Sequence, residues 1–76
     1  MICIQVYDSR NGKPLENAKV ALGFHGFTNM GSTPYVHTDS NGCAYFDREP
    51  DNDVTVYING STVHRGPVSG AETFHV

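Results

Sequence analysis

Apolar and polar residues alternate in several short stretches of the chain, which is the pattern of strands with one buried face. The first example is Ile2, Ile4 and Val6, separated by residues suited to an outward face. Comparable segments predict seven strands, at about residues 2–7, 18–24, 35–38, 43–46, 54–58, 61–65 and 73–76. No segment has the length or the spacing of a helix. Residues 1–76 are therefore expected to form one all-β domain, a seven-stranded β-sandwich with Greek-key connections.

Three Asn-Gly pairs separate these segments, at residues 11–12, 41–42 and 59–60. Asn and Gly adopt positive φ at low cost, and a type I′ hairpin turn requires positive φ at both central residues. The pair Asn41-Gly42 stands between two predicted strands and predicts a tight hairpin turn. Asp39, at the start of this turn, is expected to accept backbone N–H bonds within it rather than to bind a ligand.

Two stretches lack the alternation. FHGFTNMGSTP, residues 24–34, places two phenylalanines and a methionine among turn-forming residues. It is the longest irregular stretch, and such loops concentrate variation and function. DREPDND, residues 47–53, is acidic but lacks the spacing and the glycine of an EF-hand loop. A solvated polar loop is expected there, without a bound metal.

Charge and hydropathy restrict the classes of partner. The chain of 76 residues has a formal net charge of −3 and five scattered lysines and arginines. A nucleic-acid surface needs clustered positive charge, so nucleic acid is not expected as a partner. No segment approaches the roughly 20 apolar residues of a transmembrane helix, and the first residues lack the pattern of a signal peptide. We expect no membrane insertion, a cytoplasmic location if the chain is complete, and a secreted or cell-surface one if it is cut from a larger protein.

The chain contains two cysteines, Cys3 and Cys43. Two are too few for a disulfide scaffold or for an all-cysteine zinc site. One disulfide remains open in an oxidising compartment, whereas both thiols would stay reduced in the cytosol. Cys43 lies near His37 in the sequence, but no third orienting group accompanies them, so strand positions are the simpler interpretation.

The order of three segments, GKPLENAKVAL, HTDSNGCAYF and DVTVYI, resembles a known sequence pattern. It is similar to that of the carboxypeptidase regulatory-like domains, which belong to the transthyretin-like (prealbumin-like) sandwiches and lie near the Cna B-type repeats. The resemblance covers roughly residues 2–58 and implies a transthyretin-like fold. The matching positions are turn and core residues: Asp8, Gly12, Pro14, Leu15, Ala18, Val20, Leu22, Thr38, Asp39, Gly42, Phe46, Val54, Val56 and Tyr57.

Two activities of these related families leave no signature here. The transthyretin-like ureide hydrolases carry a C-terminal Tyr-Arg-Gly-Ser, whereas this chain ends Thr73-Phe74-His75-Val76. Cna B-type repeats often form a Lys–Asn isopeptide bond between the first and last strands, and residues 71–76 contain neither Asn nor Asp. Neither chemistry is therefore expected.

The remaining enzymatic alternative is a small hydrolase or metal-dependent site that uses His37, His64 and Arg65. Asp39 would assist, because residues two apart on an extended chain project to the same side and could share a metal with His37. Two ligands are an incomplete set. A surface histidine followed by a turn-capping aspartate explains the same residues more simply.

The leading hypothesis is a non-enzymatic accessory module that binds another protein or its own parent chain, without a cofactor. Contact would run through an open sheet edge or through exposed aromatic side chains, although outward tyrosines also stabilise sheets by pairing across strands. A structural subunit of a surface appendage or virion is a further alternative, and edge strands also allow a homo-oligomer. The candidate protein-binding surface comprises Tyr7, Phe24, Phe27, Met30, Tyr45 and Tyr57.

Overall fold

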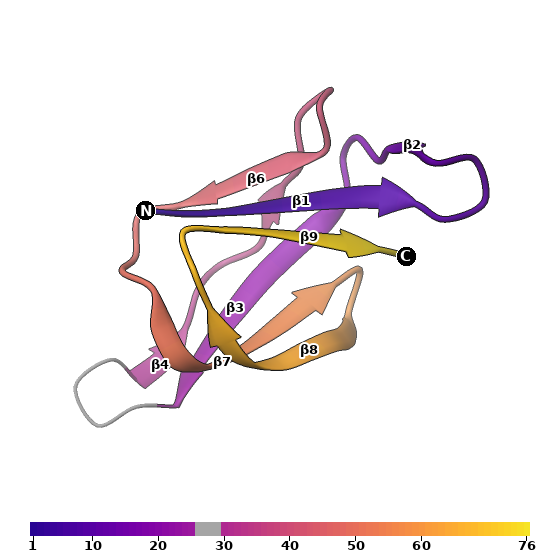
Figure 1. Ribbon diagram of the computed structural model, residues 1–76. Helices are drawn as coiled ribbons and strands as arrows, with labels where there is room; N and C mark the ends of the chain where they lie inside the picture. Colours follow the sequence, from indigo (N-terminus) through magenta and orange to yellow (C-terminus); the bar gives the residue numbers. More distant parts are fainter. Residues whose placement is uncertain (26–29) are drawn as a thin grey trace.

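The computed structural model describes residues 1–25 and 30–76 (Figure 1). Strands are the regular secondary structure of these residues, and the predicted all-β class is confirmed. Two short strands, β2 and β4, add to the seven expected ones. The strands are β1 (Ile2–Asp8), β2 (Lys13–Pro14), β3 (Lys19–His25), β4 (Met30–Ser32), β5 (Val36–His37), β6 (Cys43–Phe46), β7 (Asp51–Ile58), β8 (Ser61–Val68) and β9 (Ala71–His75).

The strands form two sheets. Sheet A is organised around β1, which pairs in parallel with β9 on one edge and antiparallel with β6 and β2 on the other. Figure 1 shows β1 and β9 side by side and running in the same direction. Sheet B is organised around β3, with the short strands β4 and β5 on one edge and β7 followed by β8 on the other.

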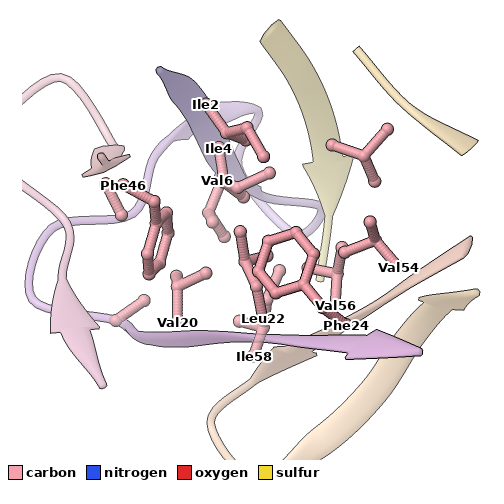
Figure 2. Close-up of a cluster of buried hydrophobic side chains, with 13 residues drawn as sticks. Ile2, Ile4, Val6, Val20, Leu22, Phe24, Phe46, Val54, Val56 and Ile58 are labelled. Atoms are coloured by element: carbon pink, nitrogen blue, oxygen red, sulfur yellow. The ribbon is translucent and has the colours of Figure 1, made fainter. Parts of the chain in front are cut away.

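The core lies between the two sheets. Ile2, Ile4 and Val6 of β1 have no exposed surface, as their alternation predicts. They point toward Leu22 and Phe24 of β3, which are also buried (Figure 2). Both sheets therefore turn one face toward a common core, the arrangement of a β-sandwich. The buried residues of both sheets form one hydrophobic cluster.

The turn at Asn41-Gly42 is present, but the predicted hairpin is wrong. Strand β5 pairs with β3 in sheet B, whereas β6 pairs with β1 in sheet A, so the turn carries the chain from one sheet to the other. Of the two central residues only Gly42 has positive φ, at 78°. Asp39 holds the turn as predicted: its Oδ1 accepts the N–H of Asn41 at 2.9 Å and that of Cys43 at 3.0 Å.

Thr38 explains why the chain leaves sheet B at this point. Its buried hydroxyl donates to the carbonyl of Leu15 at 2.6 Å and accepts the N–H of Ala18 at 2.9 Å. Its backbone N–H also donates to the Ala18 carbonyl at 2.9 Å. These bonds tie the end of β5 to the segment before β3, so β5 cannot continue antiparallel to β6.

The pair Asn59-Gly60 forms the expected hairpin between β7 and β8. Both residues have positive φ, 52° and 83°, as a type I′ turn requires. The Asn59 side chain also accepts the N–H of Lys19 at 3.0 Å, which links the turn to the central strand of sheet B.

The hairpin strands are longer than the sequence indicates. Asp51 pairs with Val68, so β7 begins within the expected acidic loop and β8 extends through Gly66 and Pro67. Glycine, proline and aspartate are poor strand formers. This end of the hairpin is nevertheless strand, and it places Val68 in the core, where the side chain is buried. Tertiary packing has overridden local propensity at these positions.

Candidate interaction surface

The structure divides the six residues of the predicted protein-binding surface among different environments. Tyr7 and Tyr45 lie on the outer face of sheet A, whereas Tyr57 lies on the outer face of sheet B, against Gly23. These two faces point in opposite directions, so the three tyrosines do not share a surface. Phe27 lies outside the described residues, and of Met30 only the backbone at the start of β4 is described.

Phe24 belongs to the core rather than to a surface. It is 3% exposed and continues the inward series of Val20 and Leu22 along β3. The guanidinium carbon of Arg48 lies 4.3 Å from the centre of its ring, a distance typical of a cation–π contact. The sequence placed Phe24 both at the end of a predicted strand and at the start of the irregular stretch 24–34, and the structure shows that its strand position decides its burial.

The outer face of sheet A is formed by alternate residues of three strands. They are Cys3, Gln5 and Tyr7 of β1, Cys43 and Tyr45 of β6, and Ala71, Thr73 and His75 of β9. Tyr7 stacks on His75, with ring centres 5.4 Å apart and planes inclined by 20°. Tyr45 is 55% exposed on the same face. Of the six residues predicted to bind a protein, Tyr7 and Tyr45 are the two that share this face.

The free edge of β9 borders this face. Val76 donates to the Tyr7 carbonyl at 2.9 Å, and the Gly70 carbonyl accepts from Cys3 at 2.9 Å. Because backbone groups alternate in direction along a strand, the N–H groups of Ala71, Thr73 and His75 point away from β1. Within the described part of the chain no strand pairs with this side of β9.

The other sheet edges of the described residues are shorter or irregular. On β8 the edge is interrupted by a bulge opposite Val56 and Tyr57 and by Gly66-Pro67, where proline has no N–H to offer. Strands β4 and β5 are three and two residues long. On β6 the backbone N–H and carbonyl of Cys43 are already bonded to Asp39. Bulges, prolines and short strands protect edges from pairing, so β9 has the least protected edge.

The residues of the enzymatic alternative do not come together. His37 is on β5, at one edge of sheet B, whereas His64 and Arg65 are on β8, at the opposite edge. Three strand spacings separate these edges, about 14 Å. The two residues on β8 are also engaged elsewhere: Arg65 pairs with Asp53 at 3.4 Å, and Nε2 of His64 lies 3.1 Å from the Pro67 carbonyl oxygen.

The acidic loop shows no preformed ion site. Residues 47–52 line an open hollow together with Pro67, Val68 and Ser69. Across residues 1–25 and 30–76, no group of three or more His, Cys, Asp or Glu side chains is placed to hold a metal ion. The same residues contain no helix long and apolar enough to cross a membrane.

Sequence reasoning missed the relation between the two cysteines. Cys3 stands opposite Tyr45, and Cys43 stands opposite Gln5 on the neighbouring strand, so the two thiols are diagonal neighbours on the outer face of sheet A. Both are half-buried and neither forms a disulfide. Alternation had placed both on outward positions, but only the pairing of β1 with β6 brings them together.

Comparison with protein-family models, curated proteins and solved structures gives no significant match. The resemblance to the carboxypeptidase regulatory-like domains therefore stays a prediction.

Proposed function

We propose that this domain is a non-enzymatic interaction module that binds an extended segment of a partner protein along the free edge of β9. The observation that carries the proposal is the row of outward N–H groups on Ala71, Thr73 and His75, on a regular strand without a bulge or a proline. Strand addition uses such a row, because main-chain hydrogen bonds supply affinity whatever the sequence of the partner.

Side chains on either side of β9 would give the interaction its specificity. An added strand would direct alternate side chains to the two faces of sheet A. On the outer face they would meet Thr73 and the His75–Tyr7 stack. On the inner face they would meet Phe74, whose ring centre lies 5.6 Å from that of His64 on β8. The half-buried Phe74 favours an apolar residue of the partner at that position.

A proline scan of β9 tests the proposal. Thr73→Pro removes an outward N–H while leaving the bonds between β9 and β1 in place, and proline is tolerated where the N–H side of a strand faces solvent. Thr73→Val is the matched control, because it changes the side chain and keeps the N–H. Extended peptides selected from a displayed random library on the wild-type domain would serve as ligands.

We expect the selected peptides to bind the wild type and Thr73→Val alike and to lose at least tenfold in affinity for Thr73→Pro, since about 1.4 kcal/mol corresponds to a factor of ten. Bound peptide should also slow hydrogen exchange at the amides of residues 71, 73 and 75. Equal binding by Thr73→Pro, or protection confined to β8 or β6, would refute the β9 edge as the binding site.

We also propose that the sandwich is of the transthyretin-like, Greek-key kind and serves as an accessory domain. The support is the order of turn and core residues that resembles the carboxypeptidase regulatory-like domains, Gly12, Asp39 and Gly42 among them. An experimental structure that can be compared strand by strand with that family is the test, and a different strand order would overturn the assignment.

A further inference from the structure

The second feature of the outer face of sheet A is a pair of thiols that the proposed peptide interaction does not use. Cys3 lies on β1 and Cys43 on β6, both half-buried and both free. Cys3 stands opposite Tyr45 and Cys43 opposite Gln5, so the two cysteines are diagonal neighbours on the same outward face. Two soft sulfur donors therefore lie beside each other on adjacent strands.

The spacing of the two cysteines disfavours a disulfide. Diagonal neighbours on antiparallel strands lie about 7–8 Å apart, beyond the distance of directly opposed residues. An unstrained disulfide needs Cα atoms about 4.4–6.8 Å apart. Bridging Cys3 and Cys43 would therefore require β1 and β6 to move, and four residue pairs between Ile2–Phe46 and Gln5–Cys43 hold these strands in register.

The same spacing suits a single ion between the two sulfur atoms. Thiolate sulfurs that share a metal each lie about 2.3 Å from it, so they can be up to about 4.6 Å apart. Two side chains that converge from diagonal positions can meet this requirement without a shift of the backbone.

We propose that Cys3 and Cys43 form a two-thiolate site for a soft monovalent metal ion, with Cu(I) as the matching species. Soft thiolates favour Cu(I), whereas structural zinc needs four protein ligands. The described residues offer no third His, Cys, Asp or Glu ligand beside the pair. An ion that accepts two ligands in a line therefore fits better than one that demands a tetrahedron.

Binding exchanges two protons for the metal. Each thiol loses its proton to solvent, and two Cu–S bonds form without any change in oxidation state. Burial and the neighbouring Cys43 thiol raise the pKa of the Cys3 thiol, so Cys3 gives up its proton less readily than an ordinary thiol. The carboxylate of Asp39 adds negative charge near the site, which favours a cation over an anion.

Competition with a chromogenic Cu(I) chelator under anaerobic conditions tests this site. Cu(I) is supplied as its bicinchoninate complex, and the wild-type chain should withdraw one ion per chain. Cys3→Ser and Cys43→Ser should each weaken binding by more than about 100-fold, because even the loss of a group that supports a metal ligand costs about 10–100-fold. Tyr45→Phe is the matched control on the same face and keeps both sulfurs. Circular dichroism confirms that each variant is folded.

X-ray absorption should then show two sulfur atoms around the copper. One ion per two chains would place the site between molecules and overturn the proposal. Strong binding by either single-cysteine variant would do the same. Rapid formation of an intramolecular disulfide with oxidised glutathione, with the fold retained, would refute the spacing on which the site depends. None of these outcomes involves the β9 edge, so they leave the peptide-binding proposal unaffected.

Discussion

The Asn-Gly pairs at residues 41–42 and 59–60 have the same composition and different structural roles. At 59–60 both residues have positive φ, and the turn joins adjacent antiparallel strands of sheet B. At 41–42 only Gly42 has positive φ, and the strands before and after the turn belong to different sheets. The dipeptide thus makes the chain turn, while neighbouring contacts decide where the chain continues.

The surroundings of the two glycines show the same contrast. Gly60 is exposed, and a Cβ added to it would meet no atom within 4 Å. Gly42 is buried, and its carbonyl accepts the N–H of Val6 at 2.7 Å. A Cβ on Gly42 would lie 2.5 Å from the Val6 carbonyl oxygen, closer than real Cβ atoms approach backbone. Gly42 is therefore needed for both its φ and its lack of a side chain.

The largest expected effect is that of Gly42→Ala. Positive φ costs an L-residue about 1–2 kcal/mol, and overpacking against backbone adds about 1–3 kcal/mol. We expect the free energy of unfolding to fall by about 2–5 kcal/mol, enough to unfold much of a domain this small. Gly60→Ala is the control and should lose only the first of these two contributions. Urea unfolding monitored by circular dichroism measures both, and equal losses for the two variants would refute the close approach at Gly42.

An intermediate effect should separate the asparagines of the two turns. Asn59→Ala places alanine at a φ of 52° and removes the bond to the N–H of Lys19, so it should cost about 1–3 kcal/mol. Asn41 does not have positive φ, and its side chain makes no hydrogen bond within the described residues. Asn41→Ala should therefore change the free energy of unfolding by less than about 0.5 kcal/mol. Similar losses in the two variants would mean that both turns have the same conformation.

The smallest effect concerns the third pair, Asn11-Gly12, whose turn closes on Asp8. Hydrogen bonds from the side chain and backbone of Arg10 lower the pKa of the Asp8 carboxyl below its ordinary value of 3.8. A lowered pKa contributes stability above the ordinary value, and this contribution is lost as the pH falls through the folded-state pKa. Asp8→Asn should therefore lose less stability than the wild type between about pH 4 and pH 2.

Urea midpoints measured across this pH range check the Asp8 prediction. Glu16→Gln is the matched control, because Glu16 is exposed and makes no hydrogen bond within the described residues. It should follow the wild-type curve. If Asp8→Asn follows that curve as well, the pairing of Asp8 with Arg10 does not contribute to acid stability.

Strand positions were the most predictable part of the fold. Alternation along β1 and β6 and the β-branched run of β7 depend on local sequence, so their residues could be assigned without knowledge of their partners. The short strand β4 could not be assigned from the sequence, because it contains Gly31 and is a strand only through its pairing with β3. The outer ends of β7 and β8 were missed for the same reason, because their residues form strands only through pairing with each other.

The candidate surfaces depended much more on tertiary structure. The sequence placed Tyr7, Tyr45 and Tyr57 on outward strand positions. Tyr57 is separated from the other two because its strand joins sheet B, whereas theirs join sheet A. The sequence also placed both cysteines outward without relating them, because register is a property of two strands rather than one.

By itself, the sequence determined the all-β class, the alternation that builds the core and the positions of three turns. These features depend on side-chain periodicity and on the backbone freedom of asparagine and glycine, both of which act within a few residues. Only the tertiary structure decided that the turn at 41–42 crosses between sheets, that β9 keeps an open edge and that two cysteines distant in the sequence become neighbours on one face. Each of these depends on hydrogen bonds and packing between segments far apart in the chain, such as those of Thr38 with residues 15–18 and of Gly42 with Val6.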